Sequence, residues 1–233
     1  MFRFFSLSLT FMAWCLSTTL SAQTNHELFR IVNDEYSAWI IRSGLLKTAQ
    51  KEILFSTFII KNDEIGNAKL KLLSDAARRG VKVRVILDDL GNKMPRDLLL
   101  YAASQGVEIK IFNKKNWLKL STVIRRMHGK MLITDSTFLL VGGRNVDNEY
   151  FHLDSVSNFL DREVLIRGER AVGNAHQHFM ALWQHEELCV PLVGTLTEDK
   201  RQRAKETFEK AALRVAADLP MLRALRARDT VRT

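Results

Sequence analysis

Three strand-like segments that alternate with helix-like segments set the strongest limit on the fold of this chain. Residues 52–60, 81–87 and 107–112 are rich in β-branched and other apolar side chains. The segments between them place apolar side chains at helical spacing, and Gly80 and Gly106 end them. Strands joined by helices need right-handed crossovers, which make neighbouring strands parallel. The sequence therefore predicts an α/β fold, with a mostly parallel mixed sheet flanked by helices.

The segments on either side continue this pattern. Apolar residues recur at close to helical spacing over 26–50, which predicts a helix there. Two further helices are expected, one past Arg170 and one past Thr195, and the second is basic and polar on most faces. We therefore expect one domain over 27–190 and a C-terminal helical connector or tail over 191–233.

The first 22 residues have the features of a targeting segment. Arg3 precedes a short apolar run, and the small residues that follow it fit a cleavage site. We expect residues 1–22 to be a signal peptide and the protein to be exported, periplasmic or membrane-associated; an uncleaved membrane anchor is the alternative. Cys15 would leave with the signal peptide. Cys189 would then be a lone thiol, which is more often buried than catalytic.

The chain is basic. It holds 35 lysine and arginine residues against 26 aspartate and glutamate residues, a formal net charge of +9 at pH 7, and its 46% apolar content excludes a disordered polar chain. Part of the positive charge gathers around Trp117, at Lys114, Lys115, Lys119, Arg125 and Arg126. An anionic phospholipid or membrane surface would bind such a segment, and so would the phosphates of a nucleic acid. A solvated positive face is the third alternative.

The residues with the most chemistry lie together in one stretch. In an extended strand residues i and i+2 share a face, so the imidazole of His128 and the ammonium of Lys130 project together. A turn about Ser136 would place Gly142 opposite Lys130 and return residues 142–145 to the neighbourhood of His128. An imidazole, an ammonium, an amide and glycine-exposed backbone N–H groups would then meet at one end of the sheet. This combination predicts a phosphate site that contains a nucleophile.

Residues 128–145 are similar, position for position, to the HKD motif of the phospholipase D superfamily. The matching residues are His128, Lys130, Asp135, Gly142, Gly143 and Asn145. The surrounding sequence, from about residue 28 to 187, resembles the first half of bacterial cardiolipin synthases. The resemblance implies a phospholipase D-like fold with a single HKD half and makes 27–190 its catalytic domain. It further implies a phosphodiesterase or phosphatidyltransferase that acts on phospholipids and needs no metal and no cofactor.

The resemblance also implies a role for each residue of the motif. His128 would be the nucleophile that attacks phosphorus and becomes a phosphohistidine, while Lys130 and Asn145 would bind the non-bridging oxygens. Asp135 belongs to the catalytic motif, but its odd offset from His128 favours a role as an acceptor that fixes the hairpin over proton transfer. Gly143 stands where many relatives have serine, so its backbone N–H would have to replace the hydroxyl.

Residues outside the motif complete the expected site. The segment 159–168 resembles the family strand whose acid orients the nucleophilic imidazole, and we assign that role to Asp161, with Glu163 second. The residues expected to bind substrate are Gly142, Gly143, Arg126 and Glu163. A zinc site at the three histidines between residues 176 and 185 is disfavoured, because only two of them share a helix face and no carboxylate completes the set.

The chain departs from the family pattern in the number of its motifs. Family enzymes use two HKD motifs, with one histidine as nucleophile and the other as general acid. No other histidine here is followed two residues later by lysine. Either two copies pair as a homodimer, each giving one His128 to a shared site, or the chain is the first half of a longer enzyme. The alternatives to a phospholipid enzyme are an exported nonspecific endonuclease of the same superfamily and an inactive truncated half.

Overall fold

The computed structural model describes residues 27–114 and 125–229. The expected signal peptide at 1–22 lies outside the described residues, as do three members of the basic segment, Lys115, Trp117 and Lys119. In the described part, no helix combines the length and the apolar character that a membrane span requires.

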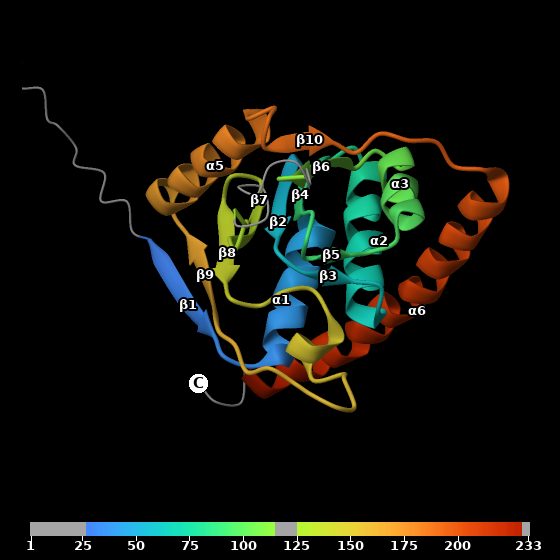
Figure 1. Ribbon diagram of the computed structural model, residues 1–233. Coiled ribbons are helices and arrows are strands. Elements are labelled where there is room, and N and C mark those ends of the chain that lie inside the picture. The colour runs from blue at the N-terminus through green and yellow to red at the C-terminus, as the bar shows by residue number, and fades with distance from the viewer. Residues whose placement is uncertain (1–26, 115–124, 230–233) are drawn as a thin grey trace, which may run out of the picture.

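A mixed eight-stranded sheet forms the centre of the described molecule (Figure 1). Its strands, in spatial order, are β1 (Leu28–Val32), β9 (Glu163–Arg167), β8 (Phe138–Gly142), β7 (Lys130–Thr134), β2 (Glu52–Thr57), β4 (Lys82–Asp88), β6 (Glu108–Phe112) and β10 (Cys189–Pro191). Strands β2, β4 and β6 run parallel, because the helices α2 (Glu64–Arg78) and α3 (Arg96–Ser104) connect them as crossovers. The strands on both sides pair antiparallel. The predicted α/β fold with a mixed sheet is confirmed.

Helices cover both faces of the sheet (Figure 1). On one face lie α1 (Glu35–Thr48), α2 and α3, with α6 (Glu198–Asp229) packed against α2 and α3, and the core on this side includes Trp39 and Leu73. The other face packs against α5 (Glu169–Gln184) through Phe179 and Trp183. Cys189 is buried on this second face, and burial raises the pKa of its thiol to about 11. The Cys189 thiol is therefore buried, as predicted.

The helix predicted over 26–50 is wrong in its first part. Leu28–Val32 forms the edge strand β1, which pairs antiparallel with β9, and the helix begins only at Glu35. Asp34 separates the two elements, because its carboxylate accepts a hydrogen bond from the Ser37 N–H at 2.7 Å and so caps α1. The strand depends on a partner far downstream in the sequence, which local periodicity does not show.

The first half of α6 belongs to the core. Ala204, Phe208 and Ala211 are buried, and the Phe208 ring packs edge-on against Tyr101 with 5.0 Å between the ring centroids. Helix α6 lies against α2 and α3 through this face. The segment that the sequence assigns to a connector or tail therefore stabilises the domain.

The hairpin of β7 and β8 has the predicted register. Lys130 pairs with Gly142, and Thr134 pairs with Phe138. Residues 135–137 connect the strands, and Asp135 and Ser136 have φ values of +53° and +49°, the left-handed conformation found at both central positions of a type I′ turn. Lys130 and Gly142 therefore lie at the same edge of the sheet, beside the end of β2.

Two small elements close that edge of the sheet. Strands β3 (Ile60–Lys61) and β5 (Asn92–Lys93) form a two-stranded sheet, and the 3-10 helix η1 (Asn148–Phe151) follows the hairpin. A β-bridge joins Ile60 to Val146. The segments after β2, β4 and β8 are thus tied to one another where the motif residues lie.

Candidate active site

His128 and Lys130 lie where β2 and β8 end and β7 and β9 begin. The exposed His128 imidazole packs edge-on against the ring of Phe58, with 4.6 Å between the centroids and 75° between the ring planes. Lys130 Nζ donates a hydrogen bond to the His128 carbonyl at 2.8 Å and lies 5.8 Å from the Phe58 ring centroid. Burial lowers the pKa of Lys130, and the nearby Asp161 carboxylate opposes this shift. One aromatic ring therefore contacts both side chains of the His-x-Lys pair.

Asn145 joins this group from the segment after β8. Its side chain is buried, its Oδ1 accepts from the Ile59 N–H at 3.1 Å, and its Nδ2 donates to the Tyr150 hydroxyl at 3.1 Å. Burial raises the pKa of Tyr150, which keeps the hydroxyl neutral. The amide orientation is fixed by these two bonds, and the second N–H of Nδ2 is the group that a ligand oxygen would meet. Tyr150 has no position in the HKD motif, so the motif spacing alone does not show its contact with Asn145.

Asp161 and Gly143 fit against each other. A Cβ atom at Gly143 would lie 2.3 Å from Asp161 Oδ2, and one at Gly142 would lie 2.4 Å from the Arg162 carbonyl, so both glycines are needed for this close approach. The Gly143 N–H donates to the Arg162 carbonyl at 3.3 Å. In this structure the N–H that would replace a serine hydroxyl is therefore already bonded, to the residue directly before β9. Within the described residues the Asp161 carboxylate makes no hydrogen bond to His128, so its orienting role stays a prediction.

Glu163 lies beneath the site and not in it. Its side chain is 1% exposed, and its carboxylate forms a bidentate ion pair with Arg42 of α1. Arg144 Nε lies 3.8 Å from the same carboxylate. The expectation that Glu163 binds substrate or serves as the second orienting acid is corrected, because both oxygens are buried against guanidinium groups. Arg42 has no signal in the sequence, since it comes from a distant helix.

Asp135 lies at the opposite end of β7 from Lys130, which is about 16 Å of extended strand away. Its carboxylate accepts hydrogen bonds from the backbone N–H groups of Gln50, Lys51 and Glu52 at 2.7 to 3.1 Å. These bonds hold the turn between α1 and β2. The role as a hairpin-fixing acceptor fits this geometry, whereas a place among the catalytic groups does not, because the carboxylate lies at the opposite end of β7 from His128 and Lys130.

Arg126 is turned toward the protein. Its Nη1 lies 3.7 Å from Oδ1 of the fully buried Asp88, and its side chain is 10% exposed. The other oxygen of Asp88 accepts from the Met127 N–H at 3.0 Å, directly before His128. Arg126 and Asp88 therefore hold the backbone that carries His128 in place. The predicted contact of Arg126 with substrate stays a prediction.

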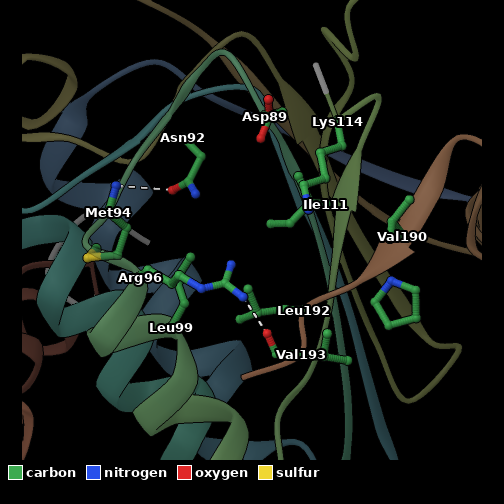
Figure 2. Close-up of a pocket in the computed structure, with 11 residues that line it drawn as sticks. Asp89, Asn92, Met94, Arg96, Leu99, Ile111, Lys114, Val190, Leu192 and Val193 are labelled. Carbon is green, nitrogen blue, oxygen red and sulfur yellow. Dashed lines mark hydrogen bonds between the residues drawn. The ribbon is translucent and has the colours of Figure 1, made fainter. Parts of the chain in front are cut away.

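A cavity of about 150 Å³ opens at the same edge of the sheet, beside the turn after β4 (Figure 2). Its polar lining consists of Asp89, Asn92, Arg96 and Lys114. The Arg96 guanidinium donates to the Val193 carbonyl, which closes one side of the cavity (Figure 2). The turn that forms another side carries Gly91, whose Cα faces the backbone of Phe58. The turn after β4 therefore borders the cavity on one side and contacts Phe58, the neighbour of His128, on the other.

No group of three or more histidine, cysteine, aspartate or glutamate side chains in the described ranges is arranged to hold a metal ion. Of the three histidines considered for zinc, His176 pairs with Glu52, with 3.1 Å between Nε2 and Oε1.

A histidine, a lysine and an asparagine at one end of a hairpin in a mixed α/β sheet define a phospholipase D-like protein. The chain belongs to the family described as the phospholipase D-like domain of cardiolipin synthase, whose model matches residues 43–183. The resemblance seen in the HKD motif is thereby confirmed. Membership places the chain in a superfamily of phosphodiesterases and phosphatidyltransferases.

Similar proteins agree with this assignment. An uncharacterized protein of Helicobacter pylori is 34% identical over 189 residues, which cover 76% of this chain and 38% of that protein. A cardiolipin synthase of Clostridium perfringens is 28% identical over 171 residues, which cover 72% of this chain and 35% of that enzyme. The chain therefore spans little more than a third of the length of these relatives.

Solved structures share the fold. Nuc of Salmonella typhimurium, a phospholipase D family member, is 16% identical with a TM-score of 0.52, and the match covers 71% of this chain and 98% of Nuc. The phosphatidylserine synthase of Haemophilus influenzae is 15% identical with a TM-score of 0.58, and the match covers 79% of this chain and 44% of that enzyme. At these identities the comparison concerns the fold alone.

Proposed function

We propose that this protein carries out phospholipase D-type phosphodiester chemistry on phospholipids, as a phosphodiesterase or phosphatidyltransferase similar to cardiolipin synthase. The observation that carries the proposal is the grouping of the exposed His128 imidazole with the Lys130 ammonium and the oriented Asn145 amide at one edge of the sheet. An anionic phosphodiester needs a nucleophile and donors for its non-bridging oxygens, and this group supplies both.

The chemistry follows from these side chains. A neutral nitrogen of His128 attacks phosphorus, a P–N bond forms, and the P–O bond to the leaving alcohol breaks. In the second step water or an acceptor alcohol attacks phosphorus, the P–N bond breaks and the imidazole is restored, while the group that protonated the leaving oxygen takes the proton of the attacking hydroxyl. Lys130 and the Nδ2 amide of Asn145 stabilise the charge on the non-bridging oxygens in both steps. The leaving oxygen needs a proton, which requires a general acid beyond these three residues.

We propose that this acid is a second histidine, supplied by another copy of the chain or by the part of the relatives' length that the chain does not match. The limited span of the match, 38% and 35% of two relatives, supports the need for a further half. Light scattering tests the homodimer form. A dimer that turns over substrate supports it, and a monomer that turns over substrate without any added partner contradicts the need for a second histidine.

The substrate test compares phosphatidylglycerol vesicles with plasmid DNA. The wild-type protein is expected to release glycerol or a new phospholipid from the vesicles, and His128→Ala is expected to abolish this turnover. His178→Ala is the matched control, because His178 is an exposed histidine on α5, outside the site. Nicking of DNA that depends on His128, without lipid turnover, would replace the proposal with the endonuclease alternative. Turnover of neither substrate would favour an inactive half.

We also propose that the protein is exported, on the basis of the N-terminal targeting features of residues 1–22. Fractionation of cells followed by N-terminal sequencing tests this. Mature protein that begins near residue 23 in the exported fraction supports the proposal, and an intact N-terminus in the cytoplasmic fraction refutes it.

A further inference from the structure

Phe58 contacts two members of the motif from outside it. It directly follows β2, and its ring is 4.6 Å from the His128 ring and 5.8 Å from Lys130 Nζ, measured to the ring centroid. The Phe58 residue is partly exposed. The perpendicular arrangement of 75° is the one that aromatic rings prefer for edge-to-face contact.

The backbone around Phe58 is fixed from two sides. The next residue, Ile59, donates its N–H to Oδ1 of Asn145 at 3.1 Å, which links Phe58 to the third motif side chain. On the other side Gly91 lies so close that a Cβ there would be 2.0 Å from the Phe58 carbonyl oxygen. The backbone that carries the Phe58 ring is therefore held in place beside the motif residues.

The same turn is tied to the segment that carries His128. Both Leu90 and Gly91 donate their N–H groups to Oδ1 of Asp88, at 2.9 and 3.3 Å. The other oxygen of Asp88 accepts from the Met127 N–H at 3.0 Å. The turn behind Phe58 and the backbone before His128 thus share one buried carboxylate.

We propose that Phe58 is a positioning residue for the nucleophile: its ring fixes the orientation of the His128 imidazole and the place of the Lys130 ammonium. This inference rests on the proposed function, since it concerns the attack of His128 on phosphorus. An imidazole on an exposed loop would otherwise sample several rotamers, and only one aims a nitrogen at phosphorus. The negative face of the aromatic ring also attracts the ammonium of Lys130 and holds it beside the nucleophile.

The kinetic test compares Phe58→Leu with Phe58→Tyr. Leucine keeps apolar bulk but removes the ring, so kcat is expected to fall about 10- to 100-fold while KM changes less than about twofold, because orientation and not binding is lost. Tyrosine keeps the ring and is expected to restore most of the activity. Phe138→Leu is the matched control, because Phe138 is also half-buried and beside a cation, Arg167, but lies at the other end of the sheet. Equal losses in Phe58→Leu and Phe138→Leu would overturn the proposal.

A second measurement needs no substrate. The ring protons of His128, assigned by comparison with His128→Ala, are expected to show a ring-current shift in nuclear magnetic resonance spectra. Phe58→Leu should abolish this shift, and Phe138→Leu should leave it unchanged. Unchanged His128 resonances in folded Phe58→Leu would refute the positioning role whatever the substrate is. A wild-type protein that turns over neither lipid nor DNA would instead refute the proposed function. The His128 resonances would in that case still test whether Phe58 positions the imidazole, because they need no substrate.

Discussion

Replacing Asp147 with asparagine should stabilise the protein, and the gain should grow as the pH rises. Asp147 lies two residues after Asn145 and is 0% exposed. Burial, the largest cause, raises the pKa of Asp147 to about 6 from the ordinary 3.8. The carboxylates of Glu149 and Asp63 add to the rise, while Lys61 and the backbone N–H of Glu149 oppose it. The folded state therefore holds a proton on Asp147 more tightly than the unfolded state does.

The sign and size of the effect follow from this difference in pKa. Because the folded state binds more protons, the free energy of unfolding falls as the pH rises from about 4 through about 6, and it levels off above that. A difference of about two pKa units corresponds to about 3 kcal/mol at pH 7.5 and about 1 kcal/mol at pH 4.5. Asparagine has nearly the same shape and no charge, so it removes this cost. For a domain of this size 3 kcal/mol corresponds to a rise in Tm of about 6 to 12 °C.

Urea and thermal unfolding of Asp147→Asn and the wild type at several pH values between 4.5 and 7.5 measure this gain. Asp154→Asn is the matched control with the opposite sign, because the N–H groups of Ser157 and Val156 lower the pKa of Asp154. That variant should gain no stability at pH 7.5. If the wild type and Asp147→Asn differ by the same amount at every pH, Asp147 does not carry a buried charge and the reasoning fails.

Three further perturbations have clear expected outcomes. Lys69 is fully buried, its Nζ has no hydrogen-bond partner in the described structure, and burial places its pKa well below 10.5. The free energy of unfolding should therefore rise toward pH 10.5 in the wild type but not in Lys69→Met. In urea unfolding at pH 7.5, Lys69→Met should be more stable than the wild type by about 1–3 kcal/mol. Glu163→Gln should lose about 3–5 kcal/mol in the same assay, because it leaves the buried Arg42 without its carboxylate; a loss below 1 kcal/mol would contradict the ion pair. Asp135→Asn should lower Tm but keep kcat close to that of the wild type, and a selective loss of kcat would return Asp135 to the reaction.

The parts of the fold that the sequence predicts correctly are those set by local chemistry. The turn at Ser136 fixes the register of its hairpin, so the approach of Gly142 to Lys130 could be derived from residue numbers alone. The strand Leu28–Val32 could not be predicted from the sequence, because its five residues have apolar side chains on both faces and become a strand only through pairing with β9. The site shows the same division. Spacing brings His128 and Lys130 together, whereas Phe58 reaches them through the order of strands in the sheet.

Arg144 shows what a motif pattern leaves out. It stands at the unspecified position between the glycines and Asn145, yet it is one of the largest fully buried side chains of the described structure. Since neighbouring residues of an extended segment face opposite sides, a ligand-facing Asn145 requires that Arg144 point inward. Its guanidinium donates to the carbonyls of Asn33, Tyr150 and Asp161, which belong to three segments that surround the site. A lysine there could not span three carbonyls with one ammonium, so Arg144→Lys should loosen the Asn145 amide and lower kcat even where the protein stays folded.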